Sequence, residues 1–207
     1  MKIKVLYEDK DILAIDKPSG ILVDSISKKY PKFILAHRLD KGTSGVMLLA
    51  KNKKAHEFLK SQFQNREVKK IYNTIVSGSV AKDHQIINKP IGRSPSDFRR
   101  WLSGRGARGT MRDAITEYKV LKRFIDKGIK FSYLEVKPKT GRTHQIRVHM
   151  KYLNHPVVGD SLYNPKGLSL PKGRMMLHAL SIEFTNLKSE KVKVESPLPA
   201  EFGKVLK

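Results

Sequence analysis

One stretch of the sequence isolates a single carboxylate among basic residues and glycines. It reads HRLDKGTSG, and Asp40 is its only acid. No other Asp or Glu occurs between Lys28 and His56, whereas Arg38 and Lys41 lie close to Asp40 on either side. Positive surroundings favour an ionised carboxylate, which can act as a nucleophile or a base. Taken alone, however, the pattern fits an aspartate that caps a glycine-rich turn better.

A second stretch, TGRTHQIRVH, lies in another acid-free window, between Val136 and Gly159. Its arginines, Arg142 and Arg147, are candidates to face a carboxylate such as Asp40 and keep it ionised. Taken alone, Arg147 reads as a solvated helix residue. The two stretches together therefore carry more information than either one.

Three common enzyme templates do not match. The stretch from Gly42 to Gly45 resembles a nucleophile elbow, but its second glycine comes one position early for G-x-S-x-G. No phosphate-binding loop of the form G-x-x-x-x-G-K-[ST] occurs. His144 and His149 miss the i, i+4 spacing of two helical metal ligands. We expect these histidines and His178 to make structural hydrogen bonds and expect no metal site.

The expected elements are many strands and few helices in mixed order, which favours an α+β fold over a doubly wound sheet. Strands are predicted for residues 2–7, 11–16, 46–50, 70–77, 114–123, 130–137, 175–184 and 191–195. Helices are predicted for residues 53–67, 141–154 and 199–207. Residues 88–112 combine prolines, glycines and arginines without periodicity, so we predict a long surface loop there, with 93–112 as a basic excursion.

Composition points to a polyanionic partner. The chain has 207 residues, with 42 Lys and Arg against 19 Asp and Glu, which gives a formal charge of +23. Such a surface concentrates phosphate ligands, so nucleic acid is the first candidate and an anionic membrane the second. A surface that is merely rich in lysine remains an alternative for any individual lysine.

The chain contains no cysteine, which excludes disulfides, thiol catalysis and cysteine-ligated metals. The N-terminal segment is charged and lacks the apolar core of a signal peptide. No apolar run approaches the length of a membrane span. We therefore expect a cytoplasmic protein without a membrane association, folded as one domain over residues 1–207.

In combination, the motifs resemble the RluA-type pseudouridine synthases. The resemblance rests on HRLD-x-x-TSG and GRTHQIRVH, each of which is specific. It is extended by IDKPSGILV, KKIYNTIVSG, HPVVGDSLY and LHALSIEF, which occur in the order typical of that family. It runs from about Lys4 to Phe184.

The resemblance implies a mixed, mostly antiparallel, bent β-sheet with peripheral helices and a central catalytic cleft. It implies isomerisation of uridine to pseudouridine in a structured ribosomal or transfer RNA, without a cofactor or metal. Many relatives carry an N-terminal RNA-binding module, and we expect no separate module here. We expect a monomer that recognises RNA through the catalytic domain itself.

The resemblance also assigns roles to residues. Asp40 matches the catalytic aspartate, and it remains open whether it attacks the sugar, adds to the base or acts as a base. Arg147 matches the basic residue that pairs with this aspartate, and Arg142 is the less favoured candidate. Tyr72 matches the tyrosine that stacks on the target base, although a half-buried strand aromatic is an alternative.

Other residues are expected to bind the RNA. Arg38 matches the residue that fills the gap left by the flipped uridine. Leu177 is expected to line the apolar side of the pocket, with a core leucine as the alternative. His144 and Gln145 are expected substrate contacts within their motif.

The stretch RRWLSGRGARGTMR differs from the usual family loop, and we expect it to contact RNA outside the active site. The candidate contacts are Arg99, Arg100, Trp101, Arg105 and Arg108. The alternative is a basic loop that adds only nonspecific charge.

Two other functions remain open on the sequence. The first is an inactive RNA-binding descendant of such an enzyme, which an intact set of Asp40, Tyr72 and Arg147 disfavours. The second is a hydrolase that removes the base, which would normally show two cooperating carboxylates.

Overall fold

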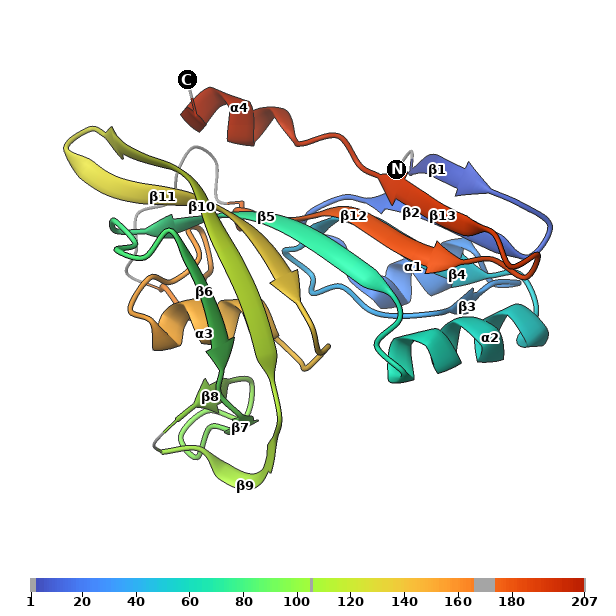
Figure 1. Ribbon diagram of the computed structural model, residues 1–207, viewed down its shortest axis with the longest axis horizontal. Helices are drawn as coiled ribbons and strands as arrows, with labels where there is room; N and C mark the ends of the chain where they lie inside the picture. The colour runs from blue at the N-terminus through green and yellow to red at the C-terminus, as the bar shows by residue number, and fades with distance from the viewer. Residues whose placement is uncertain (1–2, 105, 166–173, 207) are drawn as a thin grey trace. The chain divides into compact units, whose positions relative to one another are not determined.

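The computed structural model describes residues 3–104, 106–165 and 174–206. The chain divides into two compact units (Figure 1). Unit 1 comprises Met1–Ile71 and His178–Leu198, and unit 2 comprises Tyr72–Leu177 and Pro199–Lys207. Each unit has its own hydrophobic core. The assignment of the whole chain to one catalytic domain stays a prediction.

Unit 1 contains a sheet of strands in the order β1, β2, β4, β12 and β13, with the short β3 beside β4. The strands are β1 (Lys4–Glu8), β2 (Ile12–Lys17), β3 (Ile34–Leu35), β4 (Ser44–Ala50), β12 (Leu177–Thr185) and β13 (Lys191–Glu195). The pairing of β4 with β12 is parallel, and the pairings of β1 with β2, β2 with β4, β3 with β4 and β12 with β13 are antiparallel. All seven residues of β4 are buried, as expected for a short apolar run in the middle of a sheet.

Two helices belong to unit 1, α1 (Val23–Lys29) and α2 (Lys53–Gln64). Asn52 caps α2, because its side-chain oxygen accepts the backbone N–H of Ala55 at 2.9 Å. The apolar stripe of α2 buries Ala55 and Leu59 against Leu48 and other core residues. The predicted helix over 53–67 is therefore confirmed, whereas α1 was not predicted.

Unit 2 is built on four antiparallel strands in the order β5, β11, β10 and β6. These are β5 (Lys69–Ser77), β6 (His84–Asn88), β10 (Ile115–Asp126) and β11 (Ile129–Pro138), with helices α3 (Gln145–Tyr152) and α4 (Ala200–Leu206). Strands β10 and β11 form a hairpin whose two turn residues, Lys127 and Gly128, both have positive φ, as short hairpin turns require. Helix α3 buries Ile146 and Met150 in the core of this unit.

The predicted loop over 88–112 is wrong in its local structure. Three short strands occur there, β7 (Ile91–Arg93), β8 (Trp101–Ser103) and β9 (Arg108–Arg112). They form a separate small sheet in the order β8, β7, β9. Strands β7 and β8 have three residues each, which is too few to show a period, and β9 is exposed over its whole length, so its residues do not alternate in burial. Pairing between the three strands defines this sheet.

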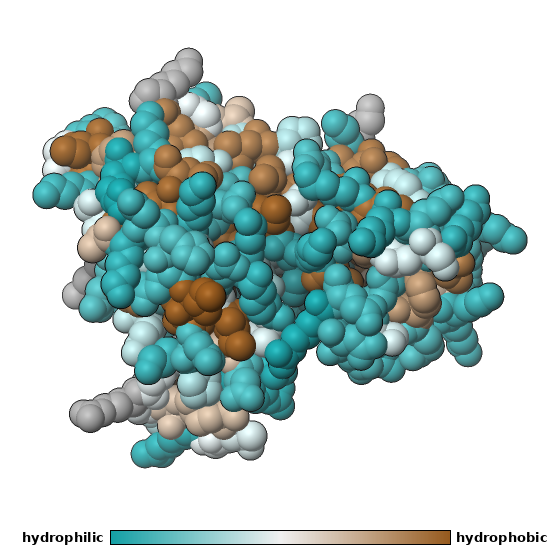
Figure 2. All heavy atoms as spheres, in the orientation of Figure 1, coloured by the Kyte–Doolittle hydropathy of each residue, from teal (hydrophilic) through white to brown (hydrophobic). Residues whose placement is uncertain are grey.

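The predicted α+β class with a mostly antiparallel sheet is confirmed. Most predicted strands appear within a few residues of their expected bounds, and β13 matches its prediction at both ends. Hydrophilic side chains cover most of the face shown in Figure 2, in keeping with the formal charge of +23. In the described part of the chain, no helix is long and apolar enough to cross a membrane.

Candidate active site

Asp40 lies in the connection between β3 and β4, within unit 1. Its side chain is half-buried, and Arg38 two positions earlier is exposed. The Asp40 carbonyl accepts the N–H of Thr43 at 3.1 Å, which closes a turn directly after the aspartate. The carboxylate therefore sits at a defined point of a tight turn that leads into a fully buried strand.

A buried lysine forms hydrogen bonds to the backbone of the residues that follow Asp40 in this turn. The ammonium group of Lys17, whose side chain is fully buried, donates to the carbonyls of Pro18 at 2.9 Å, Lys41 at 3.3 Å and Thr43 at 2.7 Å. A buried ammonium needs such acceptors, because leaving it without them would be costly. Lys17 thus ties the end of β2 to the residues that follow Asp40.

The residues after Lys17 add two further ties. The hydroxyl of Ser19 donates to the carbonyl of Gly42 at 2.6 Å, and the N–H of Gly20 donates to the carbonyl of Lys41 at 2.8 Å. The KPSG and HRLDKGTSG motifs are therefore one structural assembly. Its effect is to hold the backbone around Asp40 in place from two directions.

The end of the same motif packs closely against β12 and is joined to it by a hydrogen bond. The hydroxyl of Ser44 lies 2.8 Å from Nδ1 of His178, whose Nε2 lies 3.3 Å from the carbonyl of Ser196. Gly45 has φ of +110°, and a Cβ there would lie 2.1 Å from the carbonyl oxygen of Ala179. Only glycine fits at that position. The expected structural role of His178 is confirmed.

His37 begins the Asp40 motif and has a structural role. Its Nε2 accepts the N–H of Leu48 in β4 at 3.0 Å, and its ring lies 4.9 Å from that of Phe63. Burial, together with the charge of Lys70, lowers the pKa of His37 to about 3. His37 is therefore neutral at physiological pH and anchors the start of the turn.

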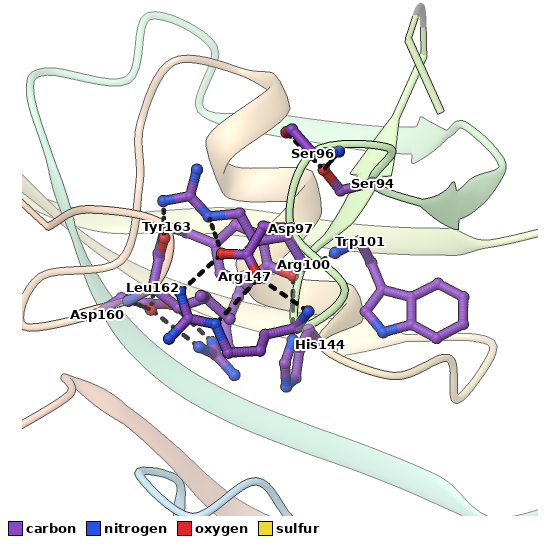
Figure 3. Close-up of polar contacts among 11 residues, drawn as sticks. Ser94, Ser96, Asp97, Arg100, Trp101, His144, Arg147, Asp160, Leu162 and Tyr163 are labelled. Atoms are coloured by element: carbon purple, nitrogen blue, oxygen red, sulfur yellow. Dashed lines mark hydrogen bonds and ion pairs between the residues drawn. The ribbon is translucent and has the colours of Figure 1, made fainter. Parts of the chain in front are cut away.

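Arg147 lies on α3 in unit 2, where its guanidinium is held by an acidic residue that the sequence did not single out. Nε donates to Oδ2 of Asp160 at 2.6 Å and Nη2 donates to Oδ1 at 2.9 Å (Figure 3). Arg147 is 8% exposed and Asp160 1%. The guanidinium also lies 5.0 Å from the ring centre of Tyr163. Arg147 is thus fixed in orientation rather than solvated.

Asp160 has further contacts that fix the carboxylate itself. Its Oδ1 accepts the N–H groups of Leu162 at 3.0 Å and Tyr163 at 3.1 Å. Gly159 precedes it with φ of +73°, and a Cβ there would lie 2.0 Å from the carbonyl oxygen of Arg174. The GDSLY part of HPVVGDSLY therefore forms a turn that positions Arg147.

The turn before α3 uses the other polar residues of its motif. Oε1 of Gln145 accepts the hydroxyl of Thr140 at 2.7 Å and the N–H of Arg142 at 2.9 Å. Its Nε2 donates to the carbonyl of Ile115 at 3.0 Å. Nε of Arg142 donates to the carbonyl of Asp113 at 2.9 Å. Gln145 joins the helix to β10, and Arg142 joins the turn before the helix to Asp113, just before β10. The expected contacts of both residues with substrate stay predictions.

Two of the motif histidines follow the structural expectation. Nδ1 of His144 lies 3.0 Å from the hydroxyl of Tyr163, and His144 itself adopts φ of +55° at the start of α3. His149 is fully buried, with Nδ1 at 2.8 Å from the hydroxyl of Thr116 and Nε2 at 3.0 Å from the carbonyl of Lys89. Burial lowers the pKa of His149.

Tyr72 and Leu177 both contribute to the core of unit 2. Tyr72 is half-buried on β5 opposite Val136 of β11, and Leu177 is 3% exposed at the start of β12. These positions match the alternatives stated for the two residues, which are a half-buried strand aromatic for Tyr72 and a core leucine for Leu177. The expected contacts of both residues with a uracil stay predictions.

The basic segment is more ordered than its composition suggested. Asp97 accepts Nε of Arg99 at 3.0 Å and Nη2 at 2.8 Å, and these hydrogen bonds lower the pKa of Asp97 to about 2. Arg100 donates from Nη2 to the carbonyl of Leu162. The N–H of Trp101 donates to the hydroxyl of Tyr163 at 2.9 Å. Strand β8 is thereby joined to the turn that holds Arg147 (Figure 3).

The expected site residues are divided between the two units. Arg38 and Asp40 belong to unit 1, whereas Tyr72, Arg147, the other motif residues and the basic segment belong to unit 2. Arg108 is exposed on β9, and Arg105 lies outside the described residues. The pairing of Arg147 with Asp40 stays a prediction.

Sequence reasoning missed Lys17, Ser44 and Asp160 as residues that position the site. One feature of the sequence could have indicated Asp160, because it is the first acid after the acid-free window between Val136 and Gly159. Among the residues that the structure describes, no group of three His, Asp or Glu could hold a metal ion.

Comparison with known proteins identifies the family of these motifs. Residues 11–152 match the family model described as RNA pseudouridylate synthase. An uncharacterised RNA pseudouridine synthase from Aquifex aeolicus is 40% identical over 84% of this chain. Ribosomal large subunit pseudouridine synthase D from Borreliella burgdorferi is 36% identical over 97% of it. The chain spans 60% and 66% of the lengths of these two relatives.

Solved structures agree with this result. Human RNA pseudouridylate synthase domain containing 1 has a TM-score of 0.86 and 30% identity, covering 97% of this chain and 87% of that one. Human RNA pseudouridylate synthase domain containing 4 has a TM-score of 0.78 and 27% identity, covering 98% and 91%.

Proposed function

Because the chain belongs to the RNA pseudouridylate synthase family, we propose that it isomerises uridine to pseudouridine within a structured RNA. The bond between N1 and C1′ breaks and a bond between C5 and C1′ forms. The hydrogen on C5 is released and N1 gains one, so the reaction is redox-neutral. The relatives named as large-subunit synthases support ribosomal RNA as the substrate class.

The observation that carries this proposal is the fixed turn around Asp40. Lys17, Ser19, Ser44 and Gly45 all constrain the backbone on which a single carboxylate is presented. A reacting carboxylate must be held close to its target geometry, because small displacements lower the rate strongly. A turn that served only as a connection would not need this many long-range ties.

Arg147 and Tyr72 complete the proposed catalytic set. We propose that Arg147 favours the ionised form of Asp40, and that Tyr72 stacks on the flipped uracil. A guanidinium has five N–H donors, so the pairing with Asp160 is compatible with this role. Leu177 and the residues Arg38, Arg142, His144 and Gln145 are proposed to contact the RNA around the target.

The residues of the basic segment are proposed as RNA contacts outside the chemistry. They are Arg99, Arg100, Trp101, Arg105 and Arg108. The protein is proposed to act as a monomer in the cytoplasm.

The test compares Asp40→Asn with wild type on an in vitro transcribed large-subunit ribosomal RNA that carries tritium at C5 of uridine. We expect tritium release to fall more than about a thousandfold, or about 4 kcal/mol in the barrier. RNA affinity in a filter-binding assay should persist, because the +23 charge supplies it. Asp24→Asn, at an exposed carboxylate of the same unit, is the matched control.

Product analysis separates this function from its alternatives. Pseudouridine in the digested RNA supports the isomerase, free uracil indicates a hydrolase, and unchanged RNA indicates a binding protein. An Asp40→Asn rate within about tenfold of wild type, or about 1.4 kcal/mol, would remove Asp40 from the chemistry.

A further inference from the structure

The small sheet of unit 2 carries an open groove of about 340 Å³ whose lining is strongly basic. The groove is lined by Arg93, Trp101, Arg108, Gly109, Thr110 and Arg112. Arg93 comes from β7, Trp101 from β8, and the other four from β9. All of these residues belong to unit 2.

Strand pairing brings the groove residues together. Arg93 on the central strand β7 lies opposite Trp101 of β8 and opposite Arg108 of β9. Directly opposite residues in antiparallel strands have Cβ atoms about 4.5 to 5.5 Å apart. The side chains of Arg93 and Arg108 therefore start from adjacent backbone positions, so both guanidinium groups can reach one ligand.

Arg93 is held in a defined orientation. Its Nη1 donates to the carbonyl of Phe98 at 2.8 Å, and its guanidinium carbon lies 4.7 Å from the ring centre of Trp101. Trp101 is itself anchored, because its N–H donates to Tyr163 and its side chain packs against the cluster of Ile91 and Val148. Because this stack already fixes the Arg93 side chain, less conformational entropy is lost when a ligand binds.

The charge of the groove is uncompensated within the described part of the chain. Arg93, Arg108 and Arg112 form no ion pair there, whereas Asp97 lies 2.8 Å from Arg99 and 3.8 Å from Arg100. Arginines that face one groove without a carboxylate repel one another, and an anionic ligand relieves this repulsion. A planar guanidinium matches the geometry of a phosphate group in particular.

We propose that this groove binds the sugar–phosphate backbone of the RNA substrate through Arg93, Arg108 and Arg112. The proposal rests on the proposed function, which makes RNA the polyanion that the protein meets. It assigns RNA contacts to Arg93 and Arg112, and it gives Trp101 the task of orienting Arg93. The groove adds affinity for RNA without adding to the chemistry.

The test is the salt dependence of RNA binding by Arg108→Gln/Arg112→Gln. Both side chains are exposed, and both are replaced by uncharged residues. Filter binding of the large-subunit ribosomal RNA transcript is measured between about 50 and 200 mM salt. The slope of log affinity against log salt should fall by about 0.7 to 0.9 for each lost contact, or about 1.4 to 1.8 in total.

Lys119→Gln/Lys130→Gln is the matched control, because it removes the same charge from exposed positions on β10 and β11 of the same unit. Its slope should stay near that of wild type. Equal slopes in the two double variants, or no change in the arginine variant, would overturn the proposal in favour of bulk charge.

A second measurement uses the wild-type protein and does not depend on variants that fold. The RNA should protect Arg108 and Arg112 from modification by phenylglyoxal, as read by mass spectrometry. Modification unaffected by RNA would overturn the proposal. Failure of the proposed function is a distinct result, because the wild type would then bind RNA with this salt slope and form no pseudouridine.

Discussion

The carboxylate of Asp160 receives two N–H groups of Arg147, with Nε at 2.6 Å from Oδ2 and Nη2 at 2.9 Å from Oδ1. Both residues are buried in unit 2. Asp160 belongs to the turn after α3, and Arg147 belongs to α3 itself. The orientation of the arginine expected to serve the chemistry thus depends on an acid outside its own motif.

Breaking this pair from one side should destabilise the protein. Asp160→Ala leaves a buried guanidinium without its carboxylate, at a cost of about 3 to 5 kcal/mol in the free energy of unfolding. A double-mutant cycle with Arg147→Met, followed by urea unfolding, measures the coupling. If the two single effects add up to that of the double variant, the pair contributes nothing beyond its separate members.

Tyr163→Phe should uncouple β8 from the Arg147 turn while keeping the ring beneath the guanidinium. The lost hydroxyl leaves the N–H of Trp101 without its acceptor, which should cost about 1 to 3 kcal/mol in unfolding free energy. Amide exchange at Trp101 should accelerate, as read by NMR. Tyr152→Phe, at an exposed tyrosine of α3, is the control. Equal exchange at Trp101 in both variants would contradict the assignment.

Lys17→Met should disturb the turn of Asp40 without removing a surface charge that could bind RNA, because Lys17 is fully buried. Three carbonyls would lose a buried donor, and each unsatisfied group costs about 1 to 3 kcal/mol. Below the unfolding temperature, single-turnover tritium release should fall while filter-binding affinity persists. Lys10→Met removes an exposed lysine of the same unit. If Lys17→Met matched this control in both rate and stability, Lys17 would not position the turn.

His37 should make the protein less stable as the pH falls. Its pKa is about 3 in the folded protein and about 6.5 when unfolded, so the unfolded chain binds more protons between these values. The contribution is complete above about pH 6.5 and is lost towards pH 3, with a limiting slope of about 1.4 kcal/mol per pH unit.

Urea unfolding across this pH range measures the effect. His37→Gln retains an acceptor for the N–H of Leu48 that does not titrate, so the dependence on pH should flatten. The buried His149 contributes with the same sign in unit 2, since burial lowers its pKa too. A His37→Gln profile as steep as that of wild type would assign the effect to other groups.

Short-range patterns in the sequence were sufficient to predict most of the elements and the family. Strand β4 is an apolar run and α2 has a helical stripe, and these features depend only on neighbours along the chain. Asp40 stood out because no other acid lies near it in the sequence. The two specific motifs were sufficient to indicate the family and, with it, the proposed reaction.

Only the tertiary structure decided how the side chains around these motifs are held. Lys17 binds backbone carbonyls of residues 41 and 43, and a carbonyl carries no signature of residue type. Asp160 meets Arg147 because a turn folds back on α3. Strands β7 and β8 are too short to show a period, and β9 is exposed over its whole length. These contacts join residues distant in sequence, so their energy depends on the folded chain rather than on local propensity.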